Sequence, residues 1–266
     1  MTTKHFLLSA WSWNPVIILA CGAALGIYAK TVGFRFGRRS GYFILAVAIF
    51  YFTLASPVSA LADGYLFSAH MLQHLLLLLV VPALALLGFP ESRTGGGLRV
   101  HPAAGWAAGM GAMWIWHERT LCNAATTLTW VRGIQVVSLI ALGVIFWWPI
   151  VGPQTGRRLP PLLGVVYLFS SCVGCTILGI LITFAPVGVV CPIYLHPVDR
   201  LGILGLIREN WGFTPALDQQ VGGLMMWVPA CGIYISGVIA LLARYYRAGE
   251  AGAATLEPGG MIDGTI

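Results

Sequence analysis

Three histidines are the residues of this sequence whose types and spacing best suit a chemical role. His70 and His74 are four residues apart, so on a helix their side chains share one face. His117 stands at the end of a later apolar run. Neutral imidazole binds copper, zinc and iron, and a neighbouring thioether adds a preference for copper(I). Because polar groups inside a membrane are costly and tend to mark function, this set predicts a metal or haem site.

A second segment, from Asp218 to Trp227, supplies the other groups expected there. Met226 is the candidate soft ligand, although a methionine in an apolar run is more often a packing residue. Asp218 is expected either to cap the helix that follows it or to orient an imidazole by a hydrogen bond. Gln73 and Gln219 are expected to support the ligands in the same way.

The composition indicates which elements must position these residues. Of the 266 residues, 58% are hydrophobic and 9% are charged, against roughly 45–50% and about 25% in soluble proteins. This excludes a soluble globular domain, a disordered chain and a disulfide-stapled secreted module, and favours a polytopic membrane protein. The net charge is +6, and the basic residues lie in short links between apolar runs. This location indicates the orientation of the chain in a membrane rather than nucleic-acid binding.

We expect an all-α membrane protein with seven transmembrane helices. Residues 1–247 form this single domain, and residues 248–266 read as a disordered cytoplasmic tail. The span near residues 102–118 is short and rich in small residues. The expected spans are residues 14–30, 41–61, 69–89, 102–118, 131–150, 160–185 and 221–243.

The basic residues predict the orientation. Ten Lys and Arg residues lie in three links and the C-terminal tail, and five lie on the other side. The positive-inside rule then places the N-terminus outside and the C-terminus in the cytoplasm. With this topology the three histidines, Asp218 and Met226 come to one outer level. The link of residues 186–220 is also outside, where with His5, Trp11 and Trp13 it is expected to roof the bundle.

The cysteines leave several possibilities open. Cys172 and Cys175 form a C-x-x-C pair without the histidine of a haem attachment motif, so they are packing residues or a copper site. A disulfide between Cys122 and Cys191 is compatible with an oxidising outer compartment. The two cysteines inside apolar runs are expected to be packing residues: Cys21 and Cys231.

No motif of a nucleotide enzyme, a serine hydrolase or an HExxH metalloprotease occurs in the sequence. We therefore expect a protein that is not an enzyme. The sequence segments that remain distinctive are Trp11-Ser-Trp13-Asn-Pro15, His70-Met-Leu-Gln-His74, Trp116-His117, Phe146-Trp-Trp-Pro149 and Asp218-Gln-Gln-Val-Gly-Gly-Leu-Met-Met-Trp227.

In this order the segments resemble the multi-spanning CtaG family of cytochrome c oxidase assembly factors, over about residues 10–247. The resemblance implies a seven-helix protein of the bacterial plasma membrane that helps haem–copper oxidase to mature by supplying copper, as Cu(I), at the outer, periplasmic side. Its partners would be oxidase subunits and membrane lipid, with no nucleic acid. The functional set that it implies is His70, His74, His117, Asp218 and Met226.

The sequence departs from the family pattern in two places. After His117 we expect a short apolar segment with a proline, whereas Glu118 to Cys122 stands there. The outer link, with Cys191 and His196, is also less standard.

Two rival functions stay open at this point. One is a haem-binding redox protein, with histidines of two spans as axial ligands. The other is a structural subunit that stabilises an oxidase complex and binds no ligand. A transporter has less support, because no chain of acidic residues crosses the expected midplane.

Overall fold

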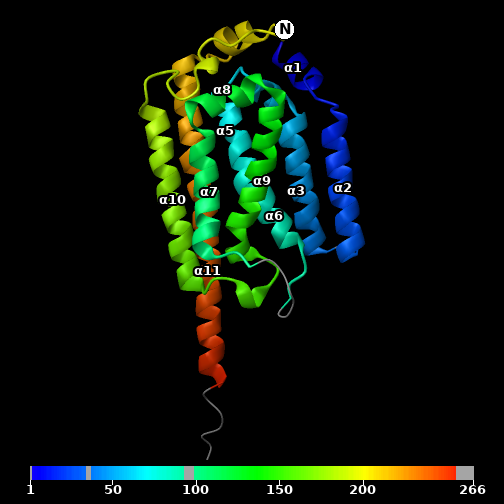
Figure 1. Cartoon of the computed structure of the whole chain (residues 1–266), viewed down its shortest axis with the longest axis vertical. Helices are drawn as coiled ribbons and strands as arrows, with labels where there is room; N and C mark the ends of the chain where they lie inside the picture. Colours follow the sequence, from blue (N-terminus) through cyan, green and yellow to red (C-terminus); the bar gives the residue numbers. More distant parts are fainter. Residues whose placement is uncertain (1, 34–36, 93–98, 256–266) are drawn as a thin grey trace, which may run out of the picture.

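The computed structural model describes residues 2–33, 37–92 and 99–255, with side chains up to residue 250. Over these residues the fold is all-α, as expected (Figure 1), and the bridge between Ser92 and Gln154 is the one β-type pairing. In chain order the elements are α1 (Thr3–Ser9), α2 (Pro15–Val32), α3 (Arg38–Ala55), α4 (Pro57–Ala62), α5 (Phe67–Leu75), the π-helix η1 (Leu76–Val80), α6 (Val81–Gly88), α7 (Pro102–Trp116), α8 (Arg119–Thr127), α9 (Thr129–Val151), η2 (Thr155–Arg157), α10 (Pro161–Phe184), η3 (Pro192–Tyr194), the π-helix η4 (Leu206–Asn210) and α11 (Pro215–Thr255).

Five helical segments of the described residues are long and apolar enough to cross a membrane. They are α2, the continuous run α5–η1–α6, α9, α10 and the stretch Pro215–Glu250 of α11. Of the other expected spans, α3 begins with Arg38 and Arg39, and α7 has only 15 residues. The protein is therefore an integral membrane protein by the length and composition of its helices.

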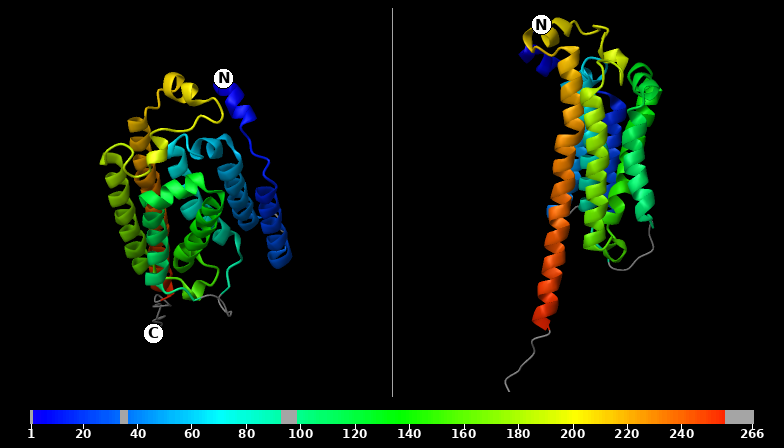
Figure 2. Two further views of the ribbon diagram at one scale, coloured as in Figure 1. Left: turned by 45° about the horizontal axis from the view of Figure 1, so that its top comes forward. Right: turned by 90° about the vertical axis from the view of Figure 1, so that its left-hand side faces the viewer.

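The long helices run between two ends of the molecule (Figure 1). The short elements α1, α4, α8, η3 and η4 gather at one of them, which we call the capped end. At the opposite end η2 follows α9, and α11 projects beyond the other helices (Figure 2). At the capped end, Trp211 contacts Phe6 edge-on and donates a hydrogen bond to Thr3 over 2.9 Å. The expected roof of link and N-terminal segment is thus present, although Trp11 and Trp13 are exposed.

The run α5–η1–α6 forms the centre of the bundle. Leu77, Leu78 and Leu79 of η1 are almost fully buried. Gly143 of α9 lets the two helices meet, because a Cβ atom at Gly143 would lie only 2.3 Å from the carbonyl oxygen of Leu78. The π-turn lies just before Pro82, which lacks the N–H that a regular helix would use.

Proline sets several helix ends, and it shortens one predicted span. The span expected over residues 41–61 ends at Ala55, because Ser56 takes an extended conformation before Pro57. The Ser56 side chain then accepts a hydrogen bond from the backbone N–H of Val58 and starts the short helix α4. The chain turns aside here, at the capped end.

The last helix is longer than predicted at both ends. It begins at Pro215 rather than near residue 221, so Asp218 lies in its first turn and not before it. It continues to Thr255, so the expected tail is helical over residues 248–255, and residues 256–266 lie outside the described part. Helix α11 packs along α10, where Gly179 and Gly223 permit close contact with Trp227 and Thr183.

Candidate metal site at the capped end

His70 and His74 lie in the interior of the bundle, with His70 in the first turn of α5 and His74 in its last turn. Each residue is only 2% exposed, and the centroids of the two rings are 4.5 Å apart. None of their four ring nitrogens has a hydrogen-bond partner. A buried polar atom without a partner costs about 1–3 kcal/mol, so two adjacent imidazoles in this state are an expensive feature of the fold.

His117 comes to the same place from another helix. It follows the last residue of α7, and its ring centroid is 5.0 Å from that of His74. Its Nδ1 atom contacts the backbone oxygen of Met113, one turn back in α7. Its Nε2 atom lies 3.0 Å from the sulfur of Met71. The three histidines of the sequence prediction are thus neighbours.

The bond to Met113 determines the tautomer of His117. A carbonyl oxygen can only accept, so Nδ1 carries the hydrogen, and Nε2 of the neutral ring presents a lone pair. That lone pair faces the thioether sulfur of Met71, which is also an electron-pair donor. A hydrogen bond from the second ring nitrogen to a backbone carbonyl is the usual way in which a metal-binding imidazole is oriented. Nε2 of His117 and the sulfur of Met71 therefore fit a soft cation.

The side chains are not arranged as a finished coordination sphere. In the part of the chain that the structure describes, no three His, Cys, Asp or Glu side chains are grouped so that they could hold a metal ion. The nearest imidazoles meet through tilted and edge-on ring faces rather than through converging nitrogens. A metal held by these residues would require the rings of His70 and His74 to rotate.

Asp218 does neither of the two things expected of it. It is 1% exposed, and it caps α5 rather than its own helix or an imidazole. One carboxylate oxygen accepts the N–H of Phe67 over 2.7 Å, and the other accepts the N–H and the hydroxyl of Ser68 over 3.0 and 2.6 Å. Asp218 therefore fixes the helical turn that carries His70, from a helix 150 residues away in the chain.

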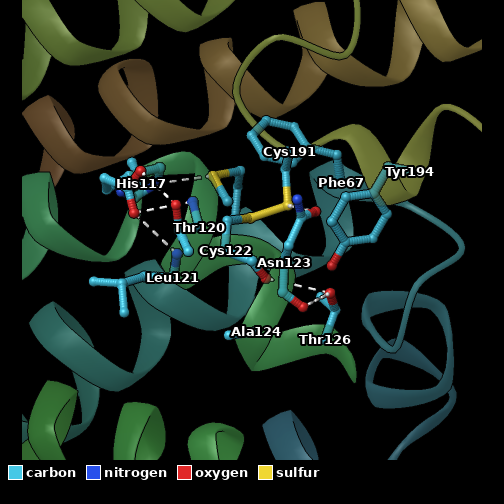
Figure 3. The surroundings of a disulfide bond; sticks show 12 residues. Phe67, His117, Thr120, Leu121, Cys122, Asn123, Ala124, Thr126, Cys191 and Tyr194 are labelled. Carbon is cyan, nitrogen blue, oxygen red and sulfur yellow. Dashed lines mark hydrogen bonds between the residues drawn. A yellow bond between two sulfur atoms is a disulfide. The ribbon is translucent and has the colours of Figure 1, made fainter. Parts of the chain in front are cut away.

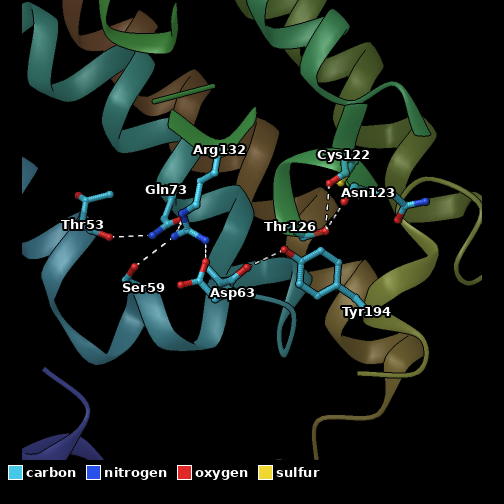
Figure 4. A network of polar contacts seen from close by, with 10 residues as sticks. Thr53, Ser59, Asp63, Gln73, Cys122, Asn123, Thr126, Arg132 and Tyr194 are labelled. Carbon is cyan, nitrogen blue, oxygen red and sulfur yellow. Dashed lines mark hydrogen bonds and ion pairs between the residues drawn. The ribbon is translucent and has the colours of Figure 1, made fainter. Parts of the chain in front are cut away.

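The two glutamines also serve other partners. Gln219 accepts the N–H of Gly188 over 2.8 Å and donates to the carbonyls of Ile182 and Ala185 at the end of α10. Gln73 donates a hydrogen bond to the backbone oxygen of Thr53 over 2.8 Å, and its side-chain oxygen accepts one from Arg132 over 3.5 Å (Figure 4).

Met71 is the thioether that the structure places beside a histidine, and the sequence interpretation missed it. Met226 is buried, and its backbone oxygen accepts a hydrogen bond from the thiol of Cys175. The signal for Met71 was its spacing, because residues 71 and 74 are three apart and share a helix face. The remaining histidines are exposed and belong to no cluster: His5, His101 and His196.

The cysteines pair across helices. Cys122 of α8 and Cys191 form a disulfide at the capped end, beside His117 (Figure 3). Cys172 is joined to Cys231 of α11, so the prediction of Cys231 as a mere packing residue was wrong. Cys172 and Cys175 do not pair with each other, and Cys175 and Cys21 are free thiols.

Comparison with known proteins identifies relatives of the chain. Residues 28–248 match the model of a family described as cytochrome c oxidase caa3 assembly factor. The chain is 24% identical over 275 residues to an uncharacterized protein of Mycobacterium leprae and 25% identical over 279 residues to one of Mycobacterium tuberculosis. These alignments cover 90% and 91% of this chain but 40% of each relative, so the chain spans under half of their length.

No solved structure matches the chain significantly. The family match covers most of the sequence, including all three buried histidines, Met71 and Asp218. The matched range also contains four of the five distinctive sequence segments, all except Trp11–Pro15. The chain therefore belongs to the cytochrome c oxidase caa3 assembly factor family.

Proposed function

We propose that this membrane-integral assembly factor carries copper(I) as cargo at the capped end and passes it to a haem–copper oxidase. Nε2 of His117 and the sulfur of Met71, 3.0 Å apart, carry the proposal, because they are two electron-pair donors that face each other. His70 and His74 would complete the site with ring nitrogens that have no other partner. The protein would transfer an ion and turn over no substrate, so no catalytic residue is proposed.

The donor set favours copper(I) over other metals. Thioether and neutral imidazole are soft or intermediate donors, whereas magnesium and calcium require oxygen ligands. Among the described residues, the buried carboxylate near the cluster is that of Asp218, and both of its oxygens accept hydrogen bonds from α5. In this arrangement Met71 replaces Met226 as the proposed thioether ligand, and Asp218 is a positioning residue.

The proposed membrane topology has seven spans, with α3 and α7 added to the five long apolar helices. The capped end is proposed to face the outside of a bacterial plasma membrane. The opposite end holds the end of α2, the start of α3, the links after α6 and α9 and the projecting α11, and eight of the thirteen described Lys and Arg residues lie there. The N-terminus then lies outside and the C-terminus in the cytoplasm. The surrounding lipid and the oxidase subunits are the proposed partners.

Metal analysis of the detergent-purified protein tests this function. After copper loading under reducing conditions and desalting, about one copper per chain is expected. The His74→Ala and His117→Ala variants should lose it, and the His196→Ala variant, altered at an exposed histidine, should keep it. Bound iron with a Soret band would replace the proposal with a haem protein. Equal copper content in all variants would exclude the cluster as the site.

The transfer step needs a second measurement. Oxidase isolated from cells that carry the His74→Ala variant should contain less copper than oxidase from wild-type cells, at similar amounts of assembly factor in the membrane. Full copper content in the oxidase would indicate a supporting role without copper transfer.

A further inference from the structure

We propose that residues 187–195 form a cover over the access route to His70, that the Cys122–Cys191 disulfide pins this cover, and that Tyr194 closes it. The inference rests on the proposed function, because it assigns the path by which the ion reaches the histidines. The ion would reach the histidines from the capped end.

Tyr194 is the cover's contact with the cluster. Its ring centroid lies 5.9 Å from that of His70 and 5.7 Å from that of Phe67, and the residue is 4% exposed. Its hydroxyl donates a hydrogen bond to the backbone oxygen of Ala62 over 2.7 Å (Figure 4). This bond holds the ring of Tyr194 in place from the side of α4. Tyr194 thus covers His70 without offering a charge to a cation.

The disulfide joins the two sides of the site. Cys122 follows His117 by five residues, and Cys191 precedes Tyr194 by three. In Figure 3 the bond lies between His117 on one side and Phe67 and Tyr194 on the other. The cover is also held by the N–H of Gly188, which donates to Gln219, but the disulfide is its one covalent anchor within the described residues.

Little space remains under the cover. A cavity of about 10 Å³ lies there, and its walls include Phe67, Cys191, Tyr194, Asp218 and Gln219. This is room for about one water molecule. A metal ion with its ligands cannot pass while Tyr194 stays in place, so access by this route requires the cover to open.

The approach from the opposite end of the bundle is apolar. Below the histidines the chain continues as Leu75 to Leu79, and four of these five leucines are almost fully buried. An ion would have to lose all its ligands there at high cost. Polar side chains do contribute to the walls of the small cavity under the cover: Asp218 and Gln219. His70, one helical turn closer to the capped end than His74, is the first imidazole on this route.

The Cys122→Ser/Cys191→Ser double variant tests the cover. We expect it to take up copper(I) from a coloured chelator complex about tenfold faster than the wild type, because a cover without its covalent anchor opens more often. The final copper content should not change. The matched control is Cys172→Ser/Cys231→Ser, which removes the disulfide between α10 and α11 and should leave the uptake rate unchanged.

A second readout requires no metal. Diethyl pyrocarbonate modifies unprotonated imidazoles, and mass spectrometry assigns each modified residue. His70 should react about tenfold faster in the Cys122→Ser/Cys191→Ser variant than in the wild type. Each of the exposed histidines should keep its wild-type reaction rate in every variant: His5, His101 and His196. Should the double variant not fold, Tyr194→Phe, which keeps the ring and loses the bond to Ala62, is expected to accelerate the reaction of His70 in the same direction.

The outcomes separate the two proposals. Faster modification of His70 without any copper binding would support the cover and refute the copper cargo. The cover would be refuted if copper binds but the rates of copper uptake and of His70 modification are unchanged in both the Cys122→Ser/Cys191→Ser variant and Tyr194→Phe. The proposed copper site would then still stand. Equal acceleration in the Cys172→Ser/Cys231→Ser control would also overturn the cover, because loosening would then be general.

Discussion

The Nε2 atom of His117 and the sulfur of Met71 lie 3.0 Å apart, although the residues are separated by 46 positions and belong to different helices. The backbone oxygen of Met113 takes the other nitrogen of the ring. In the proposed copper site Met71 therefore takes the place of Met226, the thioether chosen from the sequence.

The Met71→Leu variant should therefore bind copper(I) at least about tenfold more weakly than the wild type, because leucine has a similar volume but no electron pair to donate. The Met226→Leu variant is the control and should bind as the wild type does. Competition with a copper(I) chelator measures both affinities. Equal losses in the two variants would argue against Met71 as a ligand.

His74→Leu is expected to stabilise the copper-free protein by about 1–2 kcal/mol, because it removes two buried ring nitrogens that lack partners. The same change should abolish the rise in unfolding temperature that copper is expected to produce in the wild type. His117→Leu is the comparison: it loses the bond to Met113, so no gain in stability is expected. Both effects are measured by thermal unfolding with and without copper, monitored by far-UV circular dichroism. A destabilised His74→Leu variant would contradict the prediction.

Asp218→Ala should destabilise the protein by about 2–3 kcal/mol, because the buried N–H groups of Phe67 and Ser68 lose their acceptor. It should also weaken copper binding, since the turn that carries His70 is no longer held. Glu118 provides a cap for comparison, because its carboxylate accepts the N–H groups of Thr120 and Leu121 on an exposed surface. Glu118→Ala should cost less than about 1 kcal/mol and leave copper binding intact. Equal effects of the two changes would remove the special role of Asp218.

Gly143→Ala should destabilise the bundle by about 1–3 kcal/mol, because the added Cβ atom would meet the carbonyl oxygen of Leu78 in the central helix. Gly133 lies on the same helix with no atom near its Cβ position. Gly133→Ala should be neutral or slightly stabilising, since alanine favours helix more than glycine does. Denaturation midpoints of the two variants measure the difference. A tolerated Gly143→Ala would mean that α9 and η1 separate easily.

Cysteine labelling in whole cells should report the orientation. In a Cys21→Ser background, Val198→Cys at the capped end is expected to react with a membrane-impermeant maleimide, because position 198 is 70% exposed and proposed to lie outside. Gly156→Cys, exposed at the opposite end, should react only after the cells are opened. The reverse pattern would invert the proposed topology and place the cover in the cytoplasm.

The apolar runs and their prolines were enough to predict most helix positions. Pro15, Pro102 and Pro161 stand at helix starts close to the expected borders. The two larger errors that have a visible cause, at Ser56 and at the start of α11, could not be predicted from hydropathy. Ser56, extended before a proline, ended one helix early, and Asp218 allowed the other helix to start early, since Phe67 and Ser68 of α5 satisfy its carboxylate.

The sequence by itself determined the class of the protein, the pairing of His70 and His74 on one face, and the arrival of His117 at the same level. These follow from composition, from the helical repeat and from the alternation of spans, which are properties of the chain alone. Only the tertiary structure decided that Met71 faces His117, that Asp218 caps α5, and that Cys191 and Cys231 form disulfides with Cys122 and Cys172. These contacts depend on which helices are neighbours and how each is rotated, and close packing between helices sets both.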